Sequence, residues 1–360
     1  MQPKIRHGIT AFQRFGAIAA RDDQIWSPAF VPKERAEMRR FLALAIKVAV
    51  SAALLYVAFT RVDLGSIGAR IQQANFLWLI ALMLALAIQL ALTGLRWQQI
   101  ALQCGARFST PSALRYMLIA SFFNQTLPST IGGDAARVWL VSRAGAGWKA
   151  AAYSVVVDRI FGLAVLVAIV IVCMPWLLDQ VRDPIGRASV IFIDVAAALG
   201  TIAFLILGRV RWNWLDRLWI TRHIAGTAAV AFKVASNWRT ANMVVGLSVA
   251  SHLLTVTAVW SAARSVAAPF EFWQALLLVL PVVLVSTVPI SIAGWGVREG
   301  AMMTAFSYAG LLNSDGLIVS VLYGAGLFAV GAMGGLVWIL GADHRIGTAD
   351  LGVNESKDDR

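Results

Sequence analysis

The chain has 360 residues, of which 59% are hydrophobic and 14% are charged, and its formal net charge is +12 at pH 7. Soluble domains are about half apolar and about a quarter charged. With a mean hydropathy of +0.72, this composition excludes a soluble globular protein and indicates an integral membrane protein. The basic excess is then first a signal of membrane orientation, and it gives little reason to expect nucleic-acid binding.

The N-terminal 40 residues form a basic segment with eight Lys or Arg side chains. This segment is too long, and too charged at its end, for the n-region of a cleaved signal peptide. We therefore expect 1–40 to be a cytoplasmic basic tail, and the apolar run that starts at Phe41 to be a retained first span.

Six apolar runs are long enough to cross about 30 Å of hydrocarbon as helices. They lie at about 41–59, 76–95, 152–175, 190–208, 243–262 and 317–340. Two further apolar runs, 113–131 and 274–292, end in segments rich in proline and glycine, which indicates that the helix breaks inside the membrane. We expect an all-α, polytopic inner-membrane protein with about six full spans and two re-entrant hairpins.

The charges between the runs predict the orientation. Segment 209–242 carries six basic side chains and one acid, whereas 60–75, 176–189 and 263–273 are nearly balanced. Because basic loops stay inside, segment 209–242 and both termini are predicted to be cytoplasmic. Trp and Leu side chains among its arginines favour a helix that lies on the inner leaflet. The polar segment 341–360 is expected to be a flexible cytoplasmic tail.

One phrase occurs twice in the chain: LPSTIGGDAAR at 127–137 and VPISIAGWGVR at 288–298. Three full spans separate the two copies, so the second copy would enter the membrane from the opposite side. This predicts an inverted-topology repeat with halves at about 76–208 and 243–340, as in transporters whose broken helices meet around the substrate. Short phrases of this kind also recur by chance, but the charge topology predicts the inversion independently.

Within the two phrases, proline and glycine are predicted to break the helices and expose amides that could meet a phosphate. These residues are Pro128, Gly132, Gly133, Pro289, Gly294 and Gly296.

Charged residues inside the membrane need a partner or water. Six charged residues lie in or beside the two phrases and in the span that starts near 152. If all six faced lipid, the cost would be about 15–20 kcal/mol, at about 2.5–3.5 kcal/mol each, while an apolar residue returns only about 0.3–0.6 kcal/mol. We therefore expect them to pair, line a watery cavity or lie near the interface, and a cavity of both signs suits a zwitterionic or charged lipid head group. The predicted substrate-binding residues are Asn124, Asp134, Arg137, Asp158, Arg159, Arg298 and Glu299.

Some of these residues have other interpretations. Arg137 and Arg298 are favoured as phosphate ligands, because a guanidinium fork matches phosphate. Asp134 is equally well placed as the N-cap of a helix that starts at Ala135, with Arg137 paired to it one turn on. His252 is interpreted as a hydrogen-bonded packing residue. Snorkelling or capping is favoured for three residues near predicted span ends: Lys47, Arg96 and Asp194.

Three segments carry a resemblance to a known family: SFFNQTLPSTIGGDAAR at 121–137, VVDRIFGL at 156–163 and PISIAGWGVREG at 289–300. Over roughly 41–340 the chain resembles the transmembrane region of lysylphosphatidylglycerol synthases, the flippase-like domain. The resemblance implies a domain that moves an aminoacylated phospholipid from the inner to the outer leaflet.

The chain departs from the full synthases because no large soluble aminoacyl-transfer domain follows residue 340. We therefore expect a stand-alone, non-enzymatic member without cofactor or metal. Cys104 and Cys173 belong to different segments and predict neither a disulfide nor a metal site. The expected partners are a membrane phospholipid or lipid-linked substrate and, in one version, a separate lipid-modifying enzyme.

The leading functional hypothesis is a lipid translocase that moves a head group through a polar cavity. The sequence has no G-x-x-x-x-G-K-[ST] motif, so ATP hydrolysis by that route is not expected. A small-solute secondary transporter fits the repeat equally well, and a membrane partner of a lipid-modifying enzyme is a further alternative. A membrane-embedded transferase is weaker: Asp134-Ala-Ala-Arg137 resembles the start of a phosphotransferase motif, but the two further aspartates that this chemistry needs do not follow in register.

Overall fold

The structure is a computed structural model that describes residues 72–127, 132–209, 219–287 and 294–341, together with Ala49 and Tyr56. All of them belong to one compact unit that begins at Lys47. Every element in these ranges is a helix, which confirms the all-α prediction. Lys47, both predicted tails and the predicted span at 41–59, apart from those two residues, lie outside the described residues.

Five helices in the described ranges are long and apolar enough to cross a membrane. They are α4 (Phe76–Gln103), α7 (Trp148–Gln180), α8 (Pro184–Arg209), α10 (Trp238–Ser265) and α13 (Asn313–Leu340). Each contains one predicted run and extends beyond it, because polar residues at its ends continue the helix past the apolar stretch. The predicted loop at 176–189 is therefore wrong in length, since only 181–183 separate α7 from α8.

Four shorter helices form two pairs whose members contact each other. The first hairpin is α5 (Thr110–Thr126) with α6 (Gly132–Val141), and the second is α11 (Phe272–Ser286) with α12 (Val297–Tyr308). At 1.5 Å per residue, the 17 residues of α5 span about 25 Å, less than about 30 Å of hydrocarbon. The linking residues 128–131 and 288–293, with Pro128 and Pro289, lie outside the described residues.

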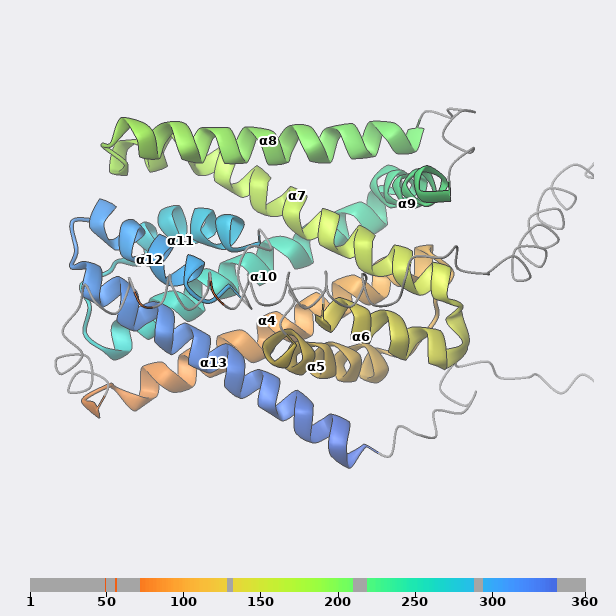
Figure 1. Cartoon of the computed structure of the whole chain (residues 1–360), viewed down its shortest axis with the longest axis horizontal. Coiled ribbons are helices and arrows are strands. Elements are labelled where there is room, and N and C mark those ends of the chain that lie inside the picture. The colour runs from red at the N-terminus through yellow and green to blue at the C-terminus, as the bar shows by residue number, and fades with distance from the viewer. Residues whose placement is uncertain are drawn as a thin grey trace, which may run out of the picture. The chain divides into compact units, whose positions relative to one another are not determined.

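The two hairpins lie toward opposite ends of the long helices, α5 and α6 at one end and α11 and α12 at the other (Figure 1). A short π-helix, η2 (Ser142–Ala146), connects the first hairpin to α7. Segment 209–242 contains the helix α9 (Trp219–Ser236), while 210–218, with most of the Trp and Leu side chains that predicted a surface helix, lie outside the described residues.

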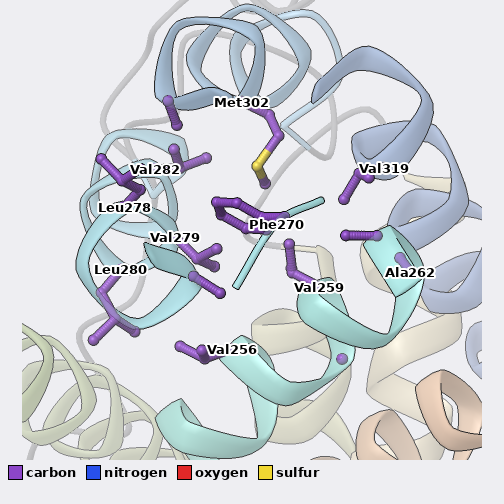
Figure 2. Packing of buried hydrophobic residues seen from close by; sticks show 14 of the residues in the cluster. Val256, Val259, Ala262, Phe270, Leu278, Val279, Leu280, Val282, Met302 and Val319 are labelled. Atoms are coloured by element: carbon purple, nitrogen blue, oxygen red, sulfur yellow. The ribbon is translucent and has the colours of Figure 1, made fainter. Parts of the chain in front are cut away.

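Buried apolar side chains hold the second hairpin against α10. Phe270, in the segment before α11, lies at the centre of this packing, beside Val259 and Ala262 of α10 and Met302 of α12 (Figure 2). Its ring centroid is 4.4 Å from that of Phe306. Aromatic pairs at this separation add stability beyond the area they bury.

Glycines on α13 allow that helix to lie close to α5. A Cβ atom added at Gly334 would collide with the carbonyl oxygen of Leu118, and one added at Gly335 would lie 2.7 Å from the ring of Phe122. Small residues that let backbones approach closely are typical of helix packing in membranes. The first hairpin is therefore held against α13 by backbone proximity.

Candidate functional site

A cavity of about 610 Å³ lies between the two hairpins, and we call it the central cavity. The first hairpin contributes Asn124, Gln125 and Asp134 to its wall, and the second contributes Ser286 and Arg298. Helices α4, α7, α10 and α13 line it as well. Part of the wall is apolar: Val259, Val279, Val282, Val283, Met302 and Leu327.

Five charged side chains from α4, α6 and α7 form a chain of alternating sign, which we call the charge chain. Asp158 accepts from two arginines, Nε of Arg96 at 2.8 Å and Nη1 of Arg137 at 2.9 Å. The other end of the Arg137 guanidinium donates to Asp134 at 2.6 Å. Asp134 also accepts from Nε of Arg159 at 2.9 Å. The order is therefore Arg96, Asp158, Arg137, Asp134, Arg159.

Burial changes sharply along the charge chain. Arg137 and Asp158 are 3% and 1% exposed, whereas the side chain of Arg159 is 53% exposed. Three cations and two carboxylates leave one positive charge uncompensated within the chain. Because Arg159 is its exposed end and lines the central cavity, the excess charge is available there.

Neighbouring side chains hold the buried arginines in place. The guanidinium of Arg137 lies 5.0 Å from the ring centroid of Trp97, within the range of a cation–π contact. Arg96 donates to the hydroxyl of Ser248 on α10 at 3.1 Å. A Cβ atom at Gly162 would lie 3.1 Å from the Arg96 guanidinium, so this glycine makes room for it.

A hydrogen bond near the turn joins the two helices of the first hairpin. The backbone N–H of Gly133 donates to the side-chain oxygen of Asn124 at 2.9 Å. A Cβ atom at Gly133 would collide with the carbonyl oxygen of Ala120. The glycine is required here for close approach of α5 and α6. Because α6 begins at Gly132, Asp134 lies in its first turn, and the N-cap interpretation of Asp134 is wrong.

The second hairpin pairs its charges with each other. Nη2 of Arg298 donates to Oε1 of Glu299 at 2.8 Å, and the hydroxyl of Ser320 donates to the same oxygen at 3.0 Å. The other oxygen of Glu299 accepts from the backbone N–H of Gly296 at 2.6 Å. Gly294 and Gly296 have φ values of 80° and 88°, which favour glycine. Their predicted role in redirecting the backbone is thereby supported.

Aromatic rings surround the guanidinium of Arg298. It lies 4.8 Å from the ring centroid of Trp295 and 5.7 Å from that of Tyr323. A Cβ atom at Gly324 of α13 would collide with it. The matched arginines of the two phrases therefore share one kind of environment, a carboxylate and an aromatic ring.

The sequence profile of one family, described as the lysylphosphatidylglycerol synthase TM region, matches residues 44–335. The match covers most of the chain and includes the charge chain and both hairpins. The chain belongs to this family. Neither the curated proteins nor the solved structures compared with the chain include a match.

Membership of this family, together with five helices of spanning length, shows a multi-pass membrane protein. The description concerns the transmembrane region, which in some members of the family is separate from the catalytic domain.

The structure divides the predicted site residues into two sets. Asn124, Asp134, Arg159 and Arg298 line the central cavity. Arg137, Asp158 and Glu299 lie behind them, at 3%, 1% and 0% exposure. The second set therefore positions the first, and within the charge chain Arg159 of α7 is better placed than Arg137 of α6 to meet a ligand.

Arg96 is a site residue that the sequence analysis misinterpreted. It was taken to lie near the end of a span that stopped at 95, but α4 continues to Gln103 and Arg96 is 6% exposed. A signal was present, since Gln89, Thr93 and Arg96 follow helical spacing and all three line the central cavity. The snorkelling interpretation of Asp194 is also wrong, because Asp194 is fully buried.

The central cavity contains one histidine. Nε2 of His252 donates to the carbonyl oxygen of Gly162 at 3.0 Å, which confirms a hydrogen-bonded residue. Among the residues that the structure describes, no group of three or more His, Cys, Asp or Glu side chains is arranged to hold a metal ion.

A second hollow, which we call the apolar groove, lies between α7, α8 and the second hairpin and has a volume of about 330 Å³. Val170, Ile193, Leu278 and Ala305 are among the apolar residues that line it. Val282 lines both the groove and the central cavity. One side chain of α11 therefore separates an apolar space from a polar one.

Proposed function

We propose that the protein is a lipid translocase, which moves a phospholipid or a modified phospholipid between leaflets through the central cavity. In this proposal it acts in a bacterial inner membrane, with both termini in the cytoplasm, and catalyses no covalent chemistry. The observation that carries the proposal is the excess positive charge that the charge chain presents at Arg159, inside the cavity between the two hairpins.

The pairing of Arg159 supports a phosphate as the group that is bound. Arg159 now donates to both oxygens of Asp134, at 2.9 Å from Nε to Oδ2 and 3.1 Å from Nη2 to Oδ1. A phosphate accepts the same fork of donors. When Arg159 turns to a phosphate, Asp134 keeps its 2.6 Å bond to Arg137, so no carboxylate is left bare. The exchange therefore requires no new charge to be buried without a partner.

The apolar groove favours a lipid over a water-soluble solute. A phospholipid carries a charged head group and apolar chains in one molecule, and the central cavity and the groove offer both environments on either side of Val282. A hydrophilic solute would leave the groove without a role. The groove is thus the feature that distinguishes the two kinds of cargo.

The positions of the hairpins support transport by alternating access. Paired broken helices that approach from opposite sides occur in transporters built from inverted repeats, where substrates bind near the midplane. The first and second hairpins lie toward opposite ends of the long helices (Figure 1). In the proposal, the inverted repeat places a substrate between them, within reach of both Arg159 and Arg298.

The test is leaflet-resolved lipid movement in proteoliposomes, with fluorescent phospholipids of several head groups and a membrane-impermeant quencher. We expect movement of lipids by the wild type and its loss in Arg159→Gln. Arg239→Gln is the matched control, because it removes the same charge from an exposed position on α10. Movement at the wild-type rate in Arg159→Gln would contradict the assigned role.

A groove-filling variant separates the lipid from the solute hypothesis. Ser189 is exposed and lines the groove, so Ser189→Trp should slow the movement of long-chain lipids. Ala196→Trp, on the exposed surface of the same helix, should leave it unchanged. Uptake of a water-soluble solute that both variants support equally would favour the solute transporter.

A further inference from the structure

Helix α8 buries one residue, and that residue is an aspartate. Of its 26 residues, Asp194 alone is buried, at 0% exposure. The most apolar window of the helix has a mean hydropathy of 2.6. Asp194 follows the start of α8 by ten residues, or about 15 Å of helix, so it lies well inside the span.

Asp194 also has no partner. Neither carboxylate oxygen forms a hydrogen bond with any residue that the structure describes. Its neighbours on α8, Val190 and Ile193, pack against the apolar core and line the apolar groove. An ionised carboxylate without a partner is very unfavourable in such surroundings, and a group of this kind neutralises by taking up a proton.

Among the described residues, no charged side chain on the adjacent helices is hydrogen-bonded to Asp194 in place of that proton. Helix α7 runs back along α8 from the short turn at 181–183, and its nearest titratable side chain at the level of Asp194 is Cys173, which is buried. Helix α9 contacts α8 closely at Gly208, about 20 Å further along, and its charged or titratable side chains are Arg222, His223 and Lys233. On α12, Tyr308 lies beside Gly186, and α11 contains no titratable residue.

We propose that Asp194 is a proton-carrying site that couples lipid movement to the proton gradient. Because the ionised form needs water or a cation, release of the proton requires α8 to shift relative to α7. Helix α8 lies along one side of the bundle beside α7 (Figure 1) and forms one wall of the apolar groove. Gain or loss of the proton therefore changes the groove in which the proposed function places an acyl chain.

A proton is the favoured ion because no other described oxygen ligand is hydrogen-bonded to the carboxylate of Asp194. An intramembrane carboxylate is by default a functional group, and proton relays are among its known uses. A metal cation would need several oxygen ligands, whereas Asp194 has no hydrogen-bonding neighbour in the described part of the chain. The step transfers a proton to and from a carboxylate oxygen and makes or breaks no other bond.

The inference rests on the proposed function, and its test has one part that needs no transport. Infrared difference spectra of wild type minus Asp194→Asn, on purified protein at neutral pH, should show the carbonyl band of a protonated carboxylic acid. A carboxylate band in its place would overturn the inference and leave the lipid translocase standing.

The second part uses proteoliposomes with an internal pH dye and an imposed pH gradient. We expect the wild type to move lipid faster with the gradient in one direction and to move protons with lipid. Asp194→Asn should lose both the gradient dependence and the proton movement. Asp179→Asn, at the exposed end of α7, is the matched control and should behave as wild type.

Each other outcome is decisive. Gradient dependence that persists in Asp194→Asn overturns the inference, as does dependence on a sodium gradient in place of a proton gradient. No lipid movement in the wild type, with the acid band present, contradicts the proposed function and leaves a proton site. Elution as a single symmetric species, for Asp194→Asn and for Asp194→Leu, controls for folding.

Discussion

The two hairpins carry matched arginines, Arg137 and Arg298, but these arginines form different ion pairs. Arg137 of the first hairpin shares one carboxylate with Arg96 of α4 and another with Arg159 of α7, so four ion pairs form one charge chain. In the second, Arg298 bonds to Glu299, the next residue, and to Ser320 of α13. The first arrangement depends on three separate helices, whereas the second is nearly complete within one turn.

The two similar sequences therefore differ in the net charge of the groups that surround them. The second hairpin is electrically neutral by itself, because Arg298 and Glu299 cancel. In the first hairpin Arg137 and Asp134 also pair, but Arg96 of α4 and Asp158 and Arg159 of α7 extend them into a charge chain with one positive charge more than its carboxylates neutralise, and its exposed end is Arg159. The repeated phrase therefore lies in two different electrostatic settings, a charge chain with a net positive charge at the first hairpin and a neutral ion pair at the second.

Removing Asp158 should have the largest effect on stability. Asp158→Ala leaves two buried arginines without their shared carboxylate, and breaking a buried pair costs about 3–5 kcal/mol. We expect a loss of this size in the free energy of unfolding of the detergent-solubilised protein, measured with denaturant. Asp179→Ala, at an exposed site, should change it by no more than about 0.5 kcal/mol. Equal losses of unfolding free energy in the two variants would contradict the central role of Asp158 in the charge chain.

Removing Glu299 should cost less. Arg298 lines the central cavity and can be hydrated there when its partner is lost, whereas Arg137 lies behind the wall. Glu299→Ala should therefore cost about 1.5–3 kcal/mol, the contribution of hydrogen bonds to a charged group. The same unfolding assay applies, and a cost above that of Asp158→Ala would reverse the comparison.

Glycine substitutions should separate two physical causes. Gly133→Ala introduces a collision with the carbonyl of Ala120 and should cost about 1–3 kcal/mol through overpacking. Gly296→Ala puts a side chain on a backbone with φ of 88° and should cost about 1–2 kcal/mol. Gly200, which has open space around it on α8, is the control, and its change to Ala should stabilise by about 0.5–1 kcal/mol.

A labelling experiment sharpens the comparison without altering stability. Arg143 and Ser307 are exposed beyond the first hairpin and near the end of the second. Single cysteines at these positions should react with an impermeant maleimide from opposite sides of the membrane. Labelling of both from one side would contradict the opposed entry of the hairpins.

The native cysteines should contribute little background to this labelling. Burial raises the pKa of the Cys104 thiol to about 12, although Lys233 partly opposes the shift, so little reactive thiolate exists at pH 7. Cys173 is buried within α7.

The sequence predicted the fold better than the site. Apolar runs and the two proline–glycine phrases placed the long helices and the interruptions, because hydropathy and backbone chemistry are local properties. Hydropathy also ended α4 too early, at 95, because the polar residues Arg96, Gln98 and Gln99 follow within the helix. The sequence indicated that the charges must pair, but the choice of Asp158 as partner of both Arg96 and Arg137 depends on helix packing, which has no local signal.

The charge chain has a consequence for biosynthesis. Arg96 precedes its carboxylate by 62 residues and its hydroxyl partner on α10 by 152 residues. At roughly 5–20 residues per second, Asp158 is made about 3–12 seconds after Arg96. For that interval α4 must stay in the membrane with an unpaired arginine, at a cost of about 2.5–3.5 kcal/mol that its apolar residues offset. Helix α4 is therefore inserted before Arg96 has an ion-pair partner, and Asp158 becomes available only after α7 has been synthesised.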